Sequence, residues 1–256
     1  MRKEVDRRLV RLADARETTV HVTAFRLEEV MLRVVRMTPE APLEEWCARE
    51  GVANAISGGY TVKPEHEPLG ELRIDGSAVD HRPFADPWRA HRGALVISDG
   101  GLAIEGRDHL PGRPEGSLLQ AGPLLVRDGR SAIAEVEDPE GFSATAEEFD
   151  QDLTADREPR LAIALTPDRF LAVAADGRTP QDAGLTLWEL ADLLIELGAC
   201  SALNMDGGSA GVIVVDGRRV NTPRDDEGED MQTSSPSVTA IVLEPLPWQR
   251  HPYGWH

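Results

Sequence analysis

Residues 160–209, RLAIALTPDRFLAVAADGRTPQDAGLTLWELADLLIELGACSALNMDGGS, decide the fold of this chain. The runs 160–166 and 170–175 are largely apolar and are separated by Pro167-Asp168, a turn signal. Two short apolar runs joined by a turn are typical of paired strands. The stretch therefore begins with two adjacent strands, and the second of them ends at Asp176-Gly177-Arg178.

The second half of this stretch predicts a helix followed by a strand. Thr186 and Glu189 form a capping box, in which the hydroxyl and the carboxylate each satisfy a free backbone N–H. Leucines then recur at helical spacing up to Gly198, a residue typical of helix C-termini. The apolar run 199–205 predicts a strand that leads directly into Asp206-Gly207-Gly208-Ser209.

The rest of the chain carries more strand signals than helix signals. A second helix is predicted over 39–50, with Thr38 as its cap and Pro39 at its first position. Long connections with little regular structure are expected at 61–92 and 105–123. Further strands are predicted at 18–36, 52–56, 94–98, 124–126, 212–215, 219–221 and 238–243.

These elements predict an α+β fold, a single domain with a large mixed or antiparallel sheet and a few packed helices. We place the domain at 18–243, between a basic N-terminal segment, 1–17, and a tail, 244–256, that has no periodicity. A helix, a glycine, a short strand and a Gly-Gly turn occur in this order at 39–59 and again at 186–208. If this is a true repeat, the two turns lie side by side; a chance recurrence explains the pattern equally well.

The composition is that of an ordinary globular protein, with 256 residues, 41% hydrophobic and 28% charged, and a formal net charge of −18. That charge repels polyanions, so nucleic acid polymers are excluded as partners. No run approaches the roughly 20 apolar residues that cross a bilayer, and the first residues lack the apolar core of a secretory signal. We therefore expect a cytoplasmic location and no membrane partner; the oligomeric state stays open.

The charge is unevenly distributed along the chain. Residues 1–36 carry nine Lys and Arg against six Asp and Glu, whereas residues 135–158 hold ten acidic residues and one basic residue. Most of these acids are expected to form a solvated surface, because a cation site needs carboxylates that converge in space. Cys47 and Cys200 lie far apart and the seven histidines show no paired spacing. Neither a disulfide framework nor a zinc site is predicted.

The most distinctive chemical feature is the sequence Asp206-Gly207-Gly208-Ser209. An acid that directly follows an apolar strand lies at the rim of a sheet. The two glycines allow a tight bend and a close approach of a ligand to backbone N–H groups. Taken alone, this pattern is equally typical of a plain turn.

The surrounding chain resembles the phosphodiester glycosidase domain family over most of residues 52–243. The matching motifs occur in the family's order. They are AISGGY (55–60), AGPLLVRDG (121–129), RLAIALTPD (160–168), ADGR (175–178), LGA (197–199), ALNMDGGS (202–209) and VVDG (214–217). The chain departs from the family pattern at Ser57, after Tyr60, at Ala210, and in 231–237, where the family's arginine has no clear counterpart.

This resemblance implies a hydrolase that cleaves the anomeric bond of a small sugar 1-phosphodiester, or of a metabolite like a nucleotide sugar. The products are the free sugar and a phosphate monoester, and no cofactor is required. Positive charge that develops on the anomeric carbon favours a carboxylate nearby. The phosphate is a weakly basic leaving group, so it needs charge neutralisation, for which arginine is suited.

The predicted site follows from these needs. Asp206 is the main catalytic carboxylate and Asp176 the second acid, while Arg160 and Arg178 bind the phosphate. Asn204 orients Asp206 or binds a sugar hydroxyl, and Tyr60 is the candidate for stacking on the sugar. Backbone and hydroxyl contacts are expected from Gly58, Gly59, Gly207, Gly208 and Ser209. For Asp176 and Arg178, a salt bridge within the turn is an equally good explanation.

Two other functions remain compatible with the sequence. One is a phosphodiesterase or other hydrolase that uses the same site with a divalent cation held by acids; the metal ligands cannot be named. The other is a binding protein for sugar phosphates that has lost catalysis, which the changes at Ser57 and Ala210 would explain. In each case the partner is a small molecule.

Overall fold

The computed structural model describes residues 1–62, 64–134, 138, 140–142 and 156–247. The acidic segment expected at 135–158 and the end of the tail lie largely outside these residues. In the described part, neither helix is long and apolar enough to cross a membrane.

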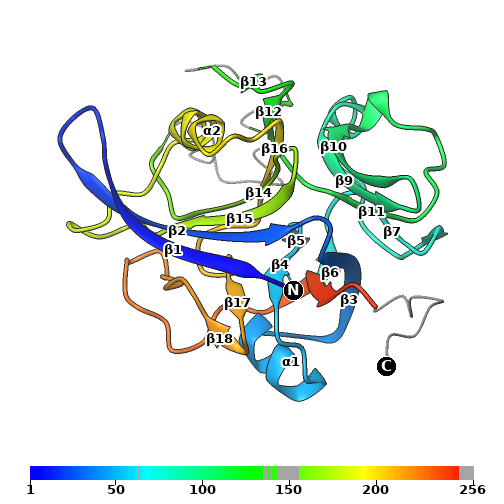
Figure 1. Ribbon diagram of the computed structural model, residues 1–256, viewed down its shortest axis with the longest axis horizontal. Coiled ribbons are helices and arrows are strands. Elements are labelled where there is room, and N and C mark those ends of the chain that lie inside the picture. Colours follow the sequence, from blue (N-terminus) through cyan, green and yellow to red (C-terminus); the bar gives the residue numbers. More distant parts are fainter. Residues whose placement is uncertain (63, 135–137, 139, 143–155, 248–256) are drawn as a thin grey trace, which may run out of the picture.

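The centre of the fold is a seven-stranded antiparallel sheet (Figure 1). This confirms the expected large sheet and the strand pair at the start of 160–209. In spatial order its strands are β1 (Lys3–Arg11), β2 (Glu17–Arg26), β15 (Arg169–Ala175), β14 (Arg160–Leu165), β16 (Ser201–Met205), β12 (Leu124–Arg127) and β13 (Arg130–Ser131). The basic start of the chain, 1–17, thus contributes the edge strand β1 to this sheet.

Two five-stranded sheets pack beside the central one. The first contains, in order, β18 (Arg218–Arg219), β17 (Ile213–Val215), β4 (Ala55–Ser57), β19 (Ser237–Pro245) and β3 (Val30–Ala41). The second contains β10 (Gly101–Gly106), β9 (Gly93–Ser98), β11 (Ser117–Gln120), β7 (Leu72–Ile74) and β8 (Ser77–Ala78). A small pair is formed by β5 (Thr61–Val62) and β6 (Glu67–Pro68).

The helical part of the fold is small. The α-helices of the described residues are α1 (Leu43–Glu50) and α2 (Leu187–Glu196), with 3-10 turns η1 (Trp88–Ala90) and η2 (Arg107–His109). The α+β expectation is therefore confirmed only in part: both predicted helices are present, but the strand content is higher than expected, and the protein is mainly β. The difference arises largely in 61–92 and 105–123, where short strands pair with distant partners such as β9, and such pairing leaves little local pattern.

Alternation along β14 explains how the layers pack. Leu161 and Ile163 face the main core, which lies between the central sheet and the two smaller sheets. The intervening Ala162 and Ala164 face α2, and their small side chains let the leucine face of that helix approach the sheet. Helix α1 covers the other side of the β17–β4–β19 sheet (Figure 1).

The helix boundaries agree with the sequence except at the start of α1. The capping box of Thr186 and Glu189 is present at α2, and Gly51 ends α1 with a left-handed backbone at φ 69°. However, α1 begins at Leu43 and not at Pro39. Pairing of β3 with β19 continues as far as Ala41, so the sheet takes residues that the local signals assigned to a helix.

Candidate active site

The predicted site residues meet because of the strand directions in the central sheet. Strand β14 runs antiparallel to both β15 and β16, so its first residue lies beside the last residues of both neighbours. Arg160 pairs with Ala175, and Leu161 pairs with Met205. The Asp176 turn and the Asp206 turn therefore leave the sheet on either side of Arg160.

The Asp206 turn is held tightly against the start of β14. A Cβ atom at Gly207 would lie 2.7 Å from the carbonyl oxygen of Pro159, and the Gly208 N–H donates to that same oxygen at 3.2 Å. The amides of Ala210 and Gly211 donate back to the Gly207 carbonyl. Only glycine fits at 207, and the turn holds the half-buried Asp206 at the sheet rim.

Arg160 is a buried cation held by neutral groups. Its Nε donates to the Leu185 carbonyl at 2.9 Å, and its Nη2 donates to the Asp156 carbonyl at 2.7 Å. Among the described residues no carboxylate oxygen lies within ion-pair distance of its guanidinium. Burial lowers the pKa of Arg160 to about 10, which still leaves it charged at neutral pH. A buried positive charge without a bonded carboxylate favours an anionic ligand.

Arg178 has a different electrostatic environment. Its Nε donates to Glu158 Oε2 at 2.7 Å, and its Nη1 lies 2.9 Å from Asp226 Oδ1. The guanidinium also reaches Gly208, because a Cβ there would lie 3.7 Å from Nη1. Arg178 therefore lies beside the Asp206 turn, but its charge is already compensated by two carboxylates.

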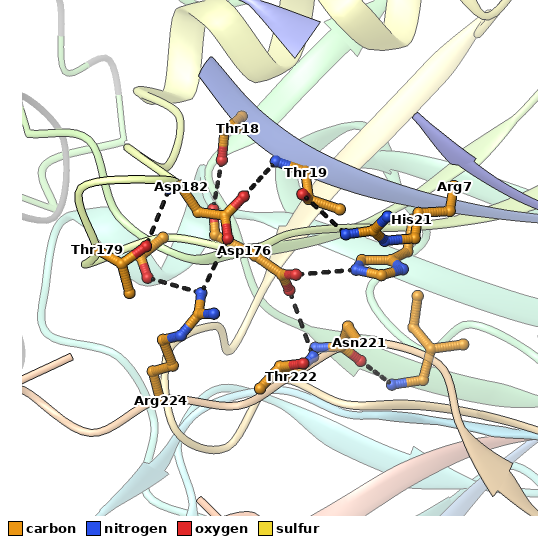
Figure 2. A network of polar contacts seen from close by, with 12 residues as sticks. Arg7, Thr18, Thr19, His21, Asp176, Thr179, Asp182, Asn221, Thr222 and Arg224 are labelled. Carbon is orange, nitrogen blue, oxygen red and sulfur yellow. Dashed lines mark hydrogen bonds and ion pairs between the residues drawn. The ribbon is translucent and has the colours of Figure 1, made fainter. Parts of the chain in front are cut away.

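Asp176 takes part in a network of polar contacts within the fold (Figure 2). Its Oδ2 lies 3.0 Å from Nε2 of the buried His21, and its Oδ1 accepts the Thr222 N–H at 3.3 Å. The carboxylates that pair with Arg178 are Glu158 and Asp226, not Asp176. The turn salt bridge considered from the sequence is therefore absent. The carboxylate holds the 221–222 segment against β2, and its role as a second catalytic acid stays a prediction.

Replacing Asp176 by Asn tests whether its carboxylate stabilises the fold by holding the 221–222 segment against β2. The amide can still accept one hydrogen bond but leaves one buried donor unsatisfied, so we expect a loss of about 1–3 kcal/mol in the free energy of unfolding. Urea denaturation measures it. The exposed turn residue Asp128, at φ 52°, is the matched position, because Asn tolerates that backbone and should have little effect. Equal stability of both variants would contradict the network.

Arg224 also belongs to this network, although the sequence did not single it out. Its Nη1 donates to the Gly177 carbonyl at 3.1 Å and to Asp182 Oδ2 at 3.4 Å (Figure 2). Its Nε donates to Asp230 Oδ1 at 2.8 Å. It therefore ties the polar loop after Asn221 to the Asp176 turn. No local pattern marks an arginine in such a loop, and only its partners reveal it.

Tyr60 and Asn204 lie beneath the site. The Tyr60 ring is 7% exposed and packs edge-on against Phe84, and its hydroxyl donates to the Gly122 carbonyl at 2.6 Å. Asn204 Nδ2 donates to that hydroxyl at 3.0 Å, and Asn204 is 1% exposed. Stacking of Tyr60 on a sugar is therefore wrong, because the ring is a core residue. Asn204 is also buried, but its Oδ1 has no hydrogen-bond partner among the described residues, and its role beside Asp206 stays a prediction.

The other glycines also serve packing. A Cβ at Gly58 would lie 2.2 Å from Thr239 Oγ1, and the N–H groups of Gly58 and Gly59 both donate to Thr239. They are not available to a ligand, which corrects their assignment as substrate contacts. Ser57, just before them, donates to the Ala210 carbonyl at 2.7 Å and so brings the two Gly-Gly turns side by side.

Ser209 contacts Ser235, which lies just before the last strand, β19. Its hydroxyl accepts from Ser235 Oγ at 2.9 Å, and its carbonyl accepts the Ser235 N–H. The Ser209 hydroxyl proton can still be donated to a ligand. Within the described ranges, no three His, Cys, Asp or Glu side chains converge as a metal site requires. The arrangement thus combines one carboxylate, one buried cation and one hydroxyl.

The chain is similar in sequence to known proteins. The family model described as phosphodiester glycosidase matches residues 50–243. N-acetylglucosamine-1-phosphodiester alpha-N-acetylglucosaminidase of Mus musculus is 26% identical over 209 residues, which covers 79% of this chain and 39% of the mouse protein. The Bos taurus enzyme of the same name is 28% identical over 210 residues, covering 79% of this chain and 38% of the bovine protein. The chain spans about two fifths of the length of these relatives.

Solved structures show the same fold. The catalytic domain of zebrafish N-acetylglucosamine-1-phosphodiester alpha-N-acetylglucosaminidase, auto-inhibited by its pro-peptide, has a TM-score of 0.70 at 19% identity, covering 94% of this chain and 82% of that one. A hypothetical protein from Synechocystis has a TM-score of 0.65 at 18% identity, covering 94% and 62%.

Proposed function

The chain belongs to the phosphodiester glycosidase family, and from this we propose that it hydrolyses a sugar 1-phosphodiester between the anomeric carbon and the phosphate oxygen. The observation that best supports the proposal is the position of Arg160. This buried cation forms no ion pair within the described residues and lies beside the turn that carries Asp206. A phosphodiester carries one negative charge, which such a cation can bind next to a carboxylate.

The reaction requires two bond changes at the anomeric carbon. The bond to the phosphate oxygen breaks and its electron pair stays on the phosphate, while a bond to oxygen forms in its place. A phosphate monoester is a weak base with a second pKa of about 6, so it leaves without a strong acid. Arg160 neutralises the phosphate, and Asp206 stabilises the positive carbon and accepts the proton lost by water.

The substrate class is a further part of the proposal. The names of the mammalian relatives specify an N-acetylglucosamine 1-phosphodiester, and this sugar is the first to test. We infer a small soluble diester, because the net charge of −18 repels polyanions while a single phosphate responds to its local site. A cytoplasmic location is a separate part of the proposal, which the charge does not address. A nucleic acid polymer or a membrane is not part of this proposal.

The proposal is tested by identifying which bond breaks. The purified protein is incubated in ¹⁸O-labelled water with the methyl phosphodiester of N-acetylglucosamine 1-phosphate. We expect free labelled sugar and unlabelled methyl phosphate. Label in the phosphate product instead would show P–O cleavage and favour the phosphodiesterase function. Tight binding without turnover, over a panel of sugars, would favour the binding protein.

A chelator separates metal-independent from metal-dependent hydrolysis. Because the proposed chemistry uses Asp206 and Arg160 alone, we expect the same rate after dialysis against EDTA as before. The control is the same dialysis followed by added Mg²⁺ or Ca²⁺. A rate that is lost on dialysis and restored by either ion would contradict a metal-independent site.

A further inference from the structure

Arg178 is held beside the Asp206 turn by an unusual backbone conformation. Its φ of 64° lies in the left-handed region that an arginine rarely adopts, and a Cβ at Gly228 would lie 2.1 Å from its carbonyl oxygen. Such strain persists where the surrounding structure holds a side chain in one particular place. Here that place is next to Gly208, which the Arg178 guanidinium approaches.

Two carboxylates from separate parts of the chain neutralise Arg178. Glu158 lies two residues before β14, and its Oε2 accepts from Arg178 Nε at 2.7 Å. Asp226 belongs to the polar loop after Asn221, and its Oδ1 lies 2.9 Å from Arg178 Nη1. The backbone of this loop also contributes, because the Asp225 carbonyl accepts from Nη1 at 3.1 Å. The positive charge of Arg178 is therefore compensated before any ligand binds.

Glu158 and Arg160 are fixed at the same point of the fold. The Leu185 carbonyl accepts both the Glu158 N–H at 3.2 Å and the Arg160 Nε at 2.9 Å. Burial has the largest influence on the pKa of Arg160 and lowers it, whereas the Glu158 carboxylate raises that pKa and the Arg178 guanidinium lowers it. The charges of these three side chains therefore act on one another, and a phosphate bound at Arg160 would experience all of them.

We propose that Glu158 and Asp226 make this site selective for phosphodiesters over phosphate monoesters, an inference that rests on the proposed function. The charged side chains at the proposed phosphate position include two arginines and three carboxylates, namely Arg160, Arg178, Asp206, Glu158 and Asp226. A diester carries one negative charge, which Arg160 can neutralise. A monoester carries nearly two at neutral pH, because its second pKa is about 6, and its second charge meets only carboxylates and a compensated arginine.

Two matched probes measure this selectivity without turnover. In the first, a CH₂ group replaces the oxygen between the anomeric carbon of N-acetylglucosamine and the phosphorus; the second is the monomethyl ester of the first. Neither is hydrolysed at that bond, and at a pH where the first carries two negative charges the second carries one. By calorimetry, we expect the protein to bind the ester at least about tenfold more tightly than the unesterified probe.

Neutral variants of the two carboxylates should reduce this ratio of dissociation constants. Glu158→Gln should lower it about fivefold, because the Glu158 side chain is only 28% exposed and its charge is weakly screened. Asp226→Asn should lower it about twofold, because that side chain is 89% exposed. Glu244→Gln is the matched control: it removes a carboxylate from an ion pair with Arg33 and should leave the ratio unchanged.

The ratio separates electrostatic selection from a merely structural role. If Glu158 only held Arg178 in position, its loss would change the affinity for both probes by the same factor. An unchanged ratio in folded Glu158→Gln, or equal binding of both probes by the unaltered protein, would overturn the proposal. Thermal denaturation checks folding, and Asp226→Asn, at an exposed side chain, keeps the test decisive if Glu158→Gln does not fold.

Failure of the proposed function gives a different result. A protein that binds the two probes with the expected ratio but does not hydrolyse the methyl phosphodiester would contradict the hydrolysis and retain the selectivity. Binding of neither probe would overturn the phosphate site itself, and this proposal with it. Hydrolysis of the diester together with an unchanged ratio in the variants would overturn only the role of Glu158 and Asp226.

Discussion

Replacing Asp206 by Asn is expected to reduce kcat by about 10³-fold on any sugar 1-phosphodiester that the protein cleaves, the order of magnitude for losing a positioned acid–base group. Asn has nearly the same shape but no negative charge. It can neither stabilise the positive anomeric carbon nor accept the proton from water. Because Asp206 follows β16 at the sheet rim and is half-buried, the fold should be retained.

The control for this experiment is a chemically identical change at another turn. Asp128 lies in the exposed turn between β12 and β13, far along the chain from the site, so Asp128→Asn should keep full activity. Rates are measured by release of free sugar, and folding by thermal denaturation of both variants. Normal turnover by a folded Asp206→Asn protein would remove Asp206 from the mechanism.

The second large effect is expected at Arg160. Removing one partner of a buried charged contact costs about 2–5 kcal/mol, so Arg160→Gln should lower kcat/KM by about 10²–10³-fold. The change should appear in both KM and kcat, because the phosphate is charged in the bound substrate and gains a further negative charge as its bond to the anomeric carbon breaks. The comparison is Arg178→Gln, whose effect should be smaller since Glu158 and Asp226 already compensate that arginine.

The pair of arginine variants also separates binding from stability. Arg160→Gln leaves the carbonyls of Leu185 and Asp156 with a weaker donor, so its free energy of unfolding must be measured beside its kinetics. Binding of inorganic phosphate to the folded variants by calorimetry gives the comparison directly. Equal losses of affinity at Arg160 and Arg178, or an unchanged KM at Arg160, would argue against Arg160 as the phosphate site.

The contrast between the two arginines shows why the net charge was a poor guide to the site. A charge of −18 describes the whole surface, whose effect is screened over about 8–10 Å in physiological salt. Arg160 is buried and bonded to carbonyls, so its field is local and weakly screened. A small anion can therefore be bound by a strongly acidic protein, whereas a long polyanion is repelled.

Local signals predicted those parts of the fold that neighbouring residues determine. The capping box at Thr186, the glycine end of α1 and the strand pair around Pro167 all depend on residues close in sequence, and the structure contains each of them. The strand content was underestimated because short strands such as β7 and β11 are stabilised by partners distant in sequence. The start of α1 moved for the same reason, since β19 extends β3.

The sequence by itself determined the strand pair around Pro167 and the sharp turn at Asp206, because these depend on neighbouring residues. It also determined the family, because the motifs occur in the family's order. Tertiary structure alone decided that Tyr60 is buried in the core, that Arg178 is paired with carboxylates and that Arg160 is not. Burial and charge compensation depend on which distant residues the fold brings together. That is why seven motifs in the correct order identified the family but could not show that Arg160 and Arg178 differ in charge compensation.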